Sequence, residues 1–187
     1  PDSGFTGSDS FVYRVSNGTL DDTATVTLTV DEINEPPVAS ADTYEVNEDA
    51  TLTITANTGV LANDSDPNND VLTATVLIEP AAGTLVMAAD GSFVYSPDDN
   101  FAGSDTFRYE VSDPDGETAN ATVTIDVRPV NDAPEAVADS YTATENGVLT
   151  IDASAGLLAN DSDVEQNSLS AFLSLPPSNG TATVESD

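Results

Sequence analysis

The sequence contains no cysteine, no histidine, no lysine and no tryptophan. Without cysteine the chain has neither disulfides nor thiolate metal ligands, and without histidine it lacks the commonest general base and the imidazole ligand. The absence of lysine also excludes the lysine-asparagine isopeptide bonds that cross-link some surface fibres. Any metal chemistry must therefore use oxygen ligands alone, which favours hard cations.

Basic residues are almost missing as well. Three arginines stand against 34 acidic residues, which gives a net charge of −31. Such an acidic surface repels phosphate, so nucleic acid and anionic membranes are excluded as partners, and cations are the natural counter-species. No apolar run is long enough to cross a bilayer, whereas a hydrophobic content of 39% suffices to build cores. We expect a folded acidic protein with no membrane insertion.

The chain repeats itself. The run G-F-T-G-S-D-S-F at 4–11 returns as N-F-A-G-S-D-T-F at 100–107, 96 positions later, and from Val26 and Val123 onward the offset is 97. A period of this length is a typical size for a small domain. The period divides the chain into three parts: the C-terminal strands of one repeat (1–33), a complete repeat (34–130) and the N-terminal strands of a further repeat (131–187).

Apolar and polar residues alternate within each repeat, which is the pattern of half-buried β-strands. Ala24, Val26, Leu28 and Val30, for example, alternate with threonines, and no segment shows a helical period. The pattern predicts an all-β chain of tandem immunoglobulin- or cadherin-like antiparallel β-sandwiches. In the complete repeat, the expected strands lie near 43–46, 51–54, 71–78, 83–88, 92–96, 105–112 and 118–128.

One loop carries the pattern of a cation site. Residues 61–70 read L-A-N-D-S-D-P-N-N-D, so oxygen-bearing side chains alternate, as in the first half of a calcium loop. An EF-hand is not expected, because Asn69 replaces the turn glycine and no glutamate follows at the twelfth position. A solvated turn is the alternative for a single loop of this composition. Its recurrence at 158–167 favours calcium.

Proline-containing segments at 30–37 and 127–134 join one repeat to the next and should be short and stiff. With V-N-D-A-P at 130–134, L-A-N-D-S-D-P at 61–67, A-T-V-T-I at 121–125 and the run at 100–107, the chain resembles the bacterial cadherin-like repeats of large secreted adhesins, which are related to VCBS-type repeats. The resemblance implies a bacterial protein that is secreted or attached to the cell surface, with calcium often stiffening the joints between its sandwiches.

We expect Ca²⁺ ligands from two domains at each joint. If the strands follow the immunoglobulin order, the loops at 61–70 and 113–117 emerge where the preceding linker enters. If 43–54 is instead one kinked strand, this assignment fails. The candidates at the first joint are Asn34, Glu35, Asp42, Asp64, Asp66, Asn68 and Asp70, with Asp113 and Asp115 from a loop that could equally be an ordinary tight turn. Those at the second are Glu48, Asp98, Asn131, Asp132, Asp139, Asp161 and Asp163.

The second joint differs from the first in its loop. Pro67, Asn68 and Asp70 are replaced there by Val164, Glu165 and Asn167. A site that has lost these residues is expected to bind calcium more weakly, or not at all.

Three classes of function compete. We favour a structural or adhesive repeat module of a surface fibre. A polysaccharide-binding module is the alternative, but sugar platforms usually need exposed rings, and only Phe172 is aromatic where its counterpart, Thr75, should point outward. An enzyme is not expected, because carboxylate pairs such as Asp98 and Asp99 abound on so acidic a surface.

The two end segments complement each other. Residues 1–31 and 134–187 would together rebuild a repeat that lacks only the counterparts of 91–96. Each alone leaves an apolar face and strand edges open. We therefore expect neighbouring copies of the repeat to pair head-to-tail, as part of a longer array or as open fibres. Arbitrary ends with frayed terminal pieces are the alternative.

Overall fold

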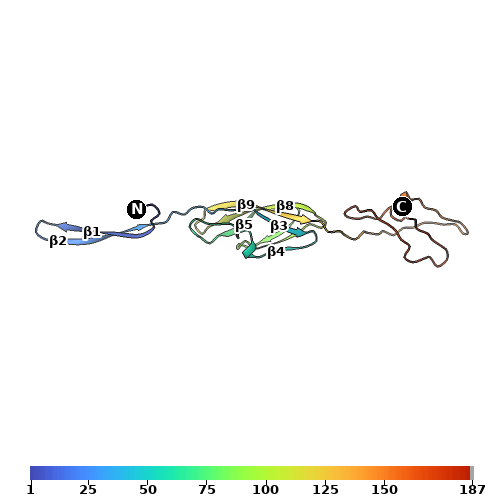
Figure 1. Ribbon diagram of the computed structural model, residues 1–187, viewed down its shortest axis with the longest axis horizontal. Helices are drawn as coiled ribbons and strands as arrows, with labels where there is room; N and C mark the ends of the chain where they lie inside the picture. The colour runs from blue at the N-terminus through green and yellow to red at the C-terminus, as the bar shows by residue number, and fades with distance from the viewer. Residues whose placement is uncertain (186–187) are drawn as a thin grey trace.

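The computed structural model describes residues 1–185, which form three parts in a row (Figure 1). A two-stranded hairpin lies at the N-terminal end, a sandwich lies in the centre, and a segment without regular strands lies at the C-terminal end. We call them the head (residues 1–33), the central domain (34–130) and the tail (131–185). None of the described helical segments is long and apolar enough to span a membrane.

The central domain is a sandwich of two sheets, as the sequence predicts. The four-stranded sheet has the order β3 (Asp42–Asn47), β9 (Thr118–Arg128), β8 (Gly103–Ser112), β5 (Thr73–Ile78). The three-stranded sheet has the order β4 (Leu52–Ile54), β7 (Phe93–Pro97), β6 (Gly83–Met87). All seven predicted strands are present, with ends within two residues of those expected. In the described residues the helical elements are two 3-10 turns, η1 (Ala56–Thr58) and η2 (Ala153–Ala155).

One strand pair departs from the expected antiparallel arrangement. β3 runs parallel to β9, with Asp42 beside Val123, because the chain changes sheet between β3 and β4. The turn that makes this change passes through Asp49 in a left-handed conformation (φ 60°). The alternative of one kinked strand over 43–54 is therefore wrong, and the loops at 61–70 and 113–117 lie at the same end of the domain.

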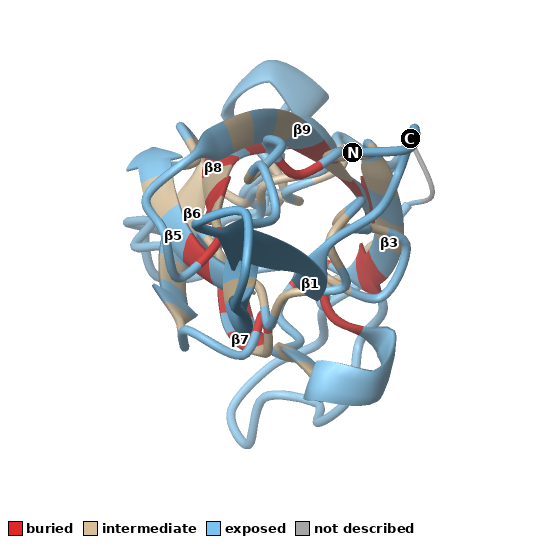
Figure 2. Ribbon diagram, turned by 90° about the vertical axis from the view of Figure 1, so that its left-hand side faces the viewer, coloured by how far each residue is buried: buried red, intermediate tan, exposed pale blue. Residues whose placement is uncertain are grey.

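The core is formed by the inward-facing residues of β7, β8 and β9. Phe107, Tyr109 and Val111 on β8 are fully buried, as are Val123 and Ile125 on β9. Figure 2, which looks along the molecule, shows the buried positions inside the ring of strands. The aromatic rings of Tyr44, Phe93 and Phe107 pack edge to face, with centroids 5.0 and 5.5 Å apart. The alternation in the sequence thus sets which face of each strand is buried.

A buried carboxylate links a strand of the core to the loop before β6 through hydrogen bonds. Asp105, only 4% exposed, accepts hydrogen bonds from the backbone N–H groups of Ala81, Ala82 and Thr106 and from the hydroxyl of Tyr95. Desolvation alone would raise its pKa, but these donors outweigh desolvation and hold the pKa of Asp105 below its usual value.

The head and the tail differ in how much structure each keeps. The head forms the hairpin of β1 (Gly7–Ser16) and β2 (Asp21–Val30) in the register of β8 and β9, with Phe11 opposite Val26. Strands expected in the tail are absent from its described residues, since the counterparts of β7, β8 and β9 that would pair with them are not supplied. The tail nevertheless keeps the local turns of the central domain, such as η2 in place of η1.

Candidate metal centres at the domain joints

At the first joint, the linker is held to the loop between β8 and β9. Asn34 donates from Nδ2 to Oδ2 of Asp113 at 2.8 Å. Asp113 is 6% exposed, and its Oδ1 accepts the backbone N–H groups of Gly116 and Glu117 at 2.7 and 2.9 Å. The bond from Asn34, followed by these backbone donors, lowers the pKa of Asp113. Asp113 is thus an ionised anchor that orients Asn34.

The loop at 61–70 folds around Asp66. Its Oδ1 accepts the backbone N–H groups of Asn68 and Asp70 at 2.8 and 3.2 Å. Asn69 makes the sharp turn in a left-handed conformation (φ 63°), which asparagine adopts more readily than most residues, so the glycine of an EF-hand is not needed. The loop is therefore shaped by its own side chains.

Asn68 clips this loop to the linker. Its Oδ1 accepts the backbone N–H of Glu35 at 2.8 Å, and its Nδ2 donates to Oε1 of Glu32 and to the carbonyl oxygen of Ile33 at 2.9 and 3.1 Å. Desolvation raises the pKa of Asp70, and the negative charges of nearby acids raise it further: Asp66, Asp115, Asp113 and Glu32. Acidic side chains from the linker and from two loops therefore converge here.

The second joint repeats this arrangement with different residues. The Nδ2 of Asn167 donates to Oδ1 of Asn131 at 2.8 Å, and the backbone N–H of Asn167 donates to Oδ1 of Asp163 at 2.8 Å. Asp132 donates its backbone N–H to Oε2 of Glu165 at 3.3 Å. The linker and the loop at 158–167 are therefore clipped together as at the first joint.

The central domain contributes carboxylates to the second joint from the turn after β3. Glu48 is 4% exposed, and its Oε1 accepts the backbone N–H of Val130 at 2.6 Å. The pKa of Asp132 is raised first by desolvation and then by Asp49, Glu165, Glu48 and Asp163. Carboxylates from both sides of the joint thus face one another.

Both joints contain buried oxygens that lack a partner. Among the described residues, four buried side-chain polar atoms have no hydrogen bond, and all four lie at the joints: Oδ1 of Asn34, Oδ2 of Asp66, Oδ2 of Asp132 and Oε1 of Glu165. Such atoms are normally paired, and each costs about 1–3 kcal/mol when it is not. All four are oxygen acceptors, the kind of atom that hard cations such as calcium bind. Within residues 1–185, no group of three or more acidic side chains has the geometry to hold a metal ion as it stands.

Comparison with known families decides the identity of these modules. Residues 34–129 match the model of the bacterial cadherin-like domain, and residues 131–187 match that of a bacterial Ig domain. The chain belongs to the bacterial cadherin-like domain family. No curated protein matches it significantly.

Several solved structures are similar to the cadherin-like chain. One is human mucin-like protocadherin EC1-2, which is 22% identical over 65% of this chain and 69% of that chain, with a TM-score of 0.42. Another is an endo-fucoidan hydrolase of glycoside hydrolase family 107, which is 24% identical over 67% of this chain, with a TM-score of 0.37. The present chain covers only 19% of the length of that hydrolase.

Four of the acids that the sequence assigns to the joints of the cadherin-like chain lie elsewhere. Asp42 and Asp64 face the Tyr109 hydroxyl, which lies 3.2 and 3.1 Å from their Oδ2 atoms. Asp64 also accepts the backbone N–H of Ser40 at 2.7 Å. In the tail the pair recurs as Asp139 and Asp161, which surround Tyr141 and raise its pKa after desolvation. Their placement at the joints is therefore corrected: these acids lie beside tyrosines.

Other assignments are changed in detail. Asp98 lies in the loop before β8, where its backbone N–H donates to the carbonyl oxygen of Ala82, and in the described part of the chain no hydrogen bond links it to the second joint. Glu35 takes part through its backbone N–H. The sequence did not nominate Glu32, Asp49, Glu165 or Asn167. Glu32 is close in sequence to the predicted linker ligands, and Asp49 follows Glu48 directly. Including the neighbours of each predicted ligand would have identified both residues.

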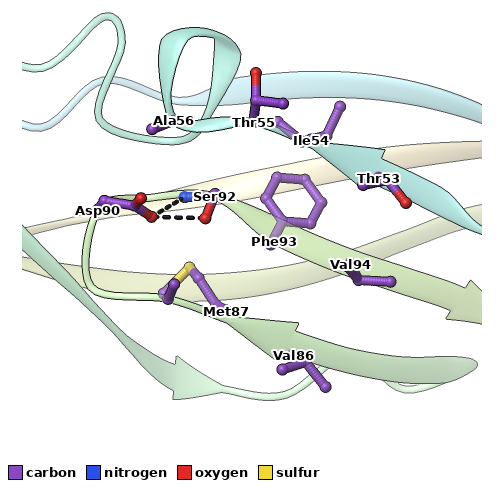
Figure 3. Close-up of a pocket in the computed structure, with 11 residues that line it drawn as sticks. Thr53, Ile54, Thr55, Ala56, Val86, Met87, Asp90, Ser92, Phe93 and Val94 are labelled. Atoms are coloured by element: carbon purple, nitrogen blue, oxygen red, sulfur yellow. Dashed lines mark hydrogen bonds between the residues drawn. The ribbon is translucent and has the colours of Figure 1, made fainter.

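The central domain also has a groove of about 480 Å³ beside η1, between β4 and β6 (Figure 3). Its walls include Ile54, Met87 and Phe93, and its single charged residue is Asp90. Asp90 accepts hydrogen bonds from the hydroxyl and the backbone N–H of Ser92 at 2.6 and 3.0 Å, and these lower its pKa. The groove offers no set of converging oxygens, so the joints remain the candidate metal centres.

Proposed function

We propose that this chain is a structural or adhesive repeat module of a bacterial surface or secreted fibre, whose joints are stiffened by Ca²⁺. The observation that supports the proposal is the placement of every buried unpaired side-chain acceptor of residues 1–185 at a joint. On this proposal the chain acts outside the cell and has no catalytic role.

Calcium suits these oxygens better than other common cations. It takes six to eight oxygen ligands in flexible geometry, whereas magnesium requires a tight octahedron and releases its waters reluctantly. Carboxylates, asparagine amides and the carbonyl oxygen of Ile33 are all ligands of this kind. We expect both joints to bind, because the carboxylate lost at Asn167 is replaced at Glu165.

The ion would act on the geometry of the joints. Without it, carboxylates on the two sides of a joint repel each other: after desolvation, which is the larger cause, Glu32 contributes to the raised pKa of Asp70, and Asp49 and Glu48 contribute to the raised pKa of Asp132. With it, the same groups share one cation, and the linker is held to both of its neighbours. The expected result is an elongated and stiffer molecule, which is what a stalk requires.

Calorimetric titration with CaCl₂ and with MgCl₂, followed by thermal melting, tests the proposal. Asp66→Asn combined with Asp163→Asn should weaken calcium binding and reduce the calcium-dependent rise in melting temperature. The matched control is Glu79→Gln combined with Asp126→Asn, which removes the same charge from two exposed side chains that are not among the candidate ligands. Identical melting curves in chelator and in millimolar calcium, or equal losses in both double variants, would refute the proposal.

A further inference from the structure

The three-stranded sheet of the central domain carries no charge. Its strands β4, β6 and β7 contain neither acidic nor basic residues, and around β6 the uncharged run covers residues 80–89, between Glu79 and Asp90. The four-stranded sheet is different, since β3, β8 and β9 all contain charged side chains. In a chain with a net charge of −31, a second copy meets the least repulsion at the uncharged sheet.

β6 is also an unprotected edge strand. In the described residues of the central domain, the strands at the sheet edges are β3, β4, β5 and β6. Charges, short length and bulges hinder the pairing of an edge with another chain. β3 contains Asp42 and Glu45, β4 has three residues, and the register of β5 shifts between Val76 and Ile78. β6 has none of these features, because its register with β7 is unbroken from Gly83 to Met87.

The outer edge of β6 presents backbone groups that no described strand pairs. Just beyond the strand, the backbone N–H of Ala88 donates to the carbonyl oxygen of Ser92 at 2.9 Å. Hydrogen bonding alternates along an antiparallel pair, so the even-numbered residues of β6 bond to β7. The odd-numbered residues from 83 to 87 therefore direct their N–H and C=O groups away from β7, toward the free edge.

We propose that β6 of one copy pairs antiparallel with β6 of a second copy, so that two three-stranded sheets become one continuous sheet. The two-fold axis passes through Leu85, which lies opposite itself, while Gly83 lies opposite Met87 and Thr84 opposite Val86. In this register the odd-numbered residues exchange their free backbone hydrogen bonds. Opposite residues point to the same face, so the core side of each strand stays on the core side. The contact is self-complementary and closes as a dimer.

The neighbouring strand favours the same partner. β5 lies on the same side of the sandwich as β6 (Figure 2), where the backbone N–H of Ala74 donates to the carbonyl oxygen of Ala89 at 3.0 Å. β5 contains no charged residue, and its Leu77 and Ile78 are 47% and 52% exposed. A basic partner would find no acidic strand on this side of the domain. A second acidic copy, in contrast, brings two uncharged strands against two uncharged strands.

The contact is expected to be weak. Glu79 and Asp90 end the uncharged run, and the proposed register brings Glu79 of one copy toward Asp90 of the other. An edge of five residues is also smaller than a standard interface, which buries about 1,600 Å² in total. We therefore expect association that depends on concentration and that NaCl strengthens by screening the two acids. This inference goes beyond calcium binding, and the oxygens at the joints take no part in it.

A charge-swap experiment tests the pairing. One full-length chain carries Thr84→Glu with Val86→Glu, and another carries Thr84→Lys with Val86→Lys; both side chains are exposed on the outer face. Sedimentation over a range of concentrations, in chelator and in calcium, measures association. Each variant alone should associate about tenfold more weakly than the wild type, because like charges then lie opposite each other. An equimolar mixture of the two variants should restore association.

The matched control introduces the same charges at Thr106 and Thr122, which are exposed on the four-stranded sheet. These changes should neither weaken association as much nor give a comparable gain on mixing. Equal behaviour of the two sets of variants would overturn the proposal. A wild-type chain that remains monomeric at every concentration, in high NaCl and with or without calcium, would also overturn it. Because the tests are read in chelator as well, their failure is distinguishable from a failure to bind calcium.

Disulfide trapping tests the register, since the natural chain contains no cysteine. Thr84→Cys chains and Val86→Cys chains are mixed and oxidised mildly. The proposed register places the two Cα atoms about 4.5 Å apart, within reach of a disulfide. The control replaces Val86→Cys with Thr53→Cys, on the same face but two strands, or about 10 Å, further from the pairing edge. We expect the first pair to form the mixed dimer several-fold faster, and equal rates would contradict the register.

Discussion

The strongest test of the core concerns the hydroxyl of Tyr109. Its oxygen lies 3.0 Å from the carbonyl oxygen of Val60, 3.1 Å from that of Ser40, 3.1 Å from Oδ2 of Asp64 and 3.2 Å from Oδ2 of Asp42. A phenol has one proton, so it can donate to only one of these four acceptors at a time. Above the pKa of Asp42, that proton also separates two carboxylates.

Asp42 supplies a second proton when the pH falls. Burial raises its pKa to about 6, helped by the charge of Asp64 and opposed by hydrogen bonds from Tyr109 and Asn63. At pH 7.5, Tyr109→Phe removes a hydrogen bond to a charged acceptor, which should cost about 1.5–3 kcal/mol of unfolding free energy. At pH 5 Asp42 is largely protonated and is no longer a charged acceptor beside the phenol, so the loss should fall toward about 0.5–1.5 kcal/mol, the contribution of a neutral hydrogen bond.

Urea unfolding followed by far-ultraviolet circular dichroism, in chelator at both pH values, measures these differences. The control is Tyr44→Phe, which removes one neutral hydrogen bond to the carbonyl oxygen of Thr58 at 2.9 Å and should cost about 1 kcal/mol at either pH. The reasoning fails if Tyr109→Phe is equally destabilising at pH 5 and pH 7.5, or if it costs no more than the control does at pH 7.5.

Three further predictions follow from the packing. Because the folded pKa of Asp42 lies above the unfolded value of 3.8, its protonation stabilises the fold at low pH, and this contribution is lost as the pH rises through about 6; Asp42→Asn should flatten that part of the pH profile of urea stability. Phe107→Ala should cost about 3–5 kcal/mol in urea, whereas Phe11→Ala, at an exposed position, should leave the unfolding of the central domain unchanged. Asp105→Ala leaves buried donors unpaired and should lower the melting temperature strongly, while Asp9→Ala in the head should not.

The fold could be predicted because most strands bury one face. Alternation of side chains assigns inward and outward positions on β8 and β9 without any knowledge of their neighbours. The same alternation does not tell which strand lies beside β3, or in which direction that strand runs. The parallel pairing of β3 with β9 therefore could not be predicted from it. That pairing requires the chain to change sheet at the turn containing Asp49. It also joins residues far apart in the sequence, such as Asp42 and Val123.

The candidate sites were predicted in part. The spacing of two selects Asp66, Asn68 and Asp70, which the structure places in the loop beside the linker, but it also selects Asp64, whose side chain faces Tyr109. The spacing of residues in the sequence shows where oxygen-bearing side chains occur, but it does not show the direction in which each side chain points. Position-by-position comparison predicts a weaker second site because Glu165 replaces Asn68 and Asn167 replaces Asp70. Such a comparison does not show that the loop still contains a carboxylate, now at Glu165.

The loop at 61–70 therefore connects the core to the joint. Asp64 binds the backbone of Ser40 and the hydroxyl of Tyr109, and two residues later Asp66 holds the turn and keeps one oxygen free at the joint. The tyrosine holds the loop in place without an ion, so on the proposed function calcium binding at the joint would cost little further conformational entropy. We therefore expect a substitution at Tyr109 to lower the affinity of the first joint for calcium, although Tyr109 lies in the core and Asp66 lies at the joint.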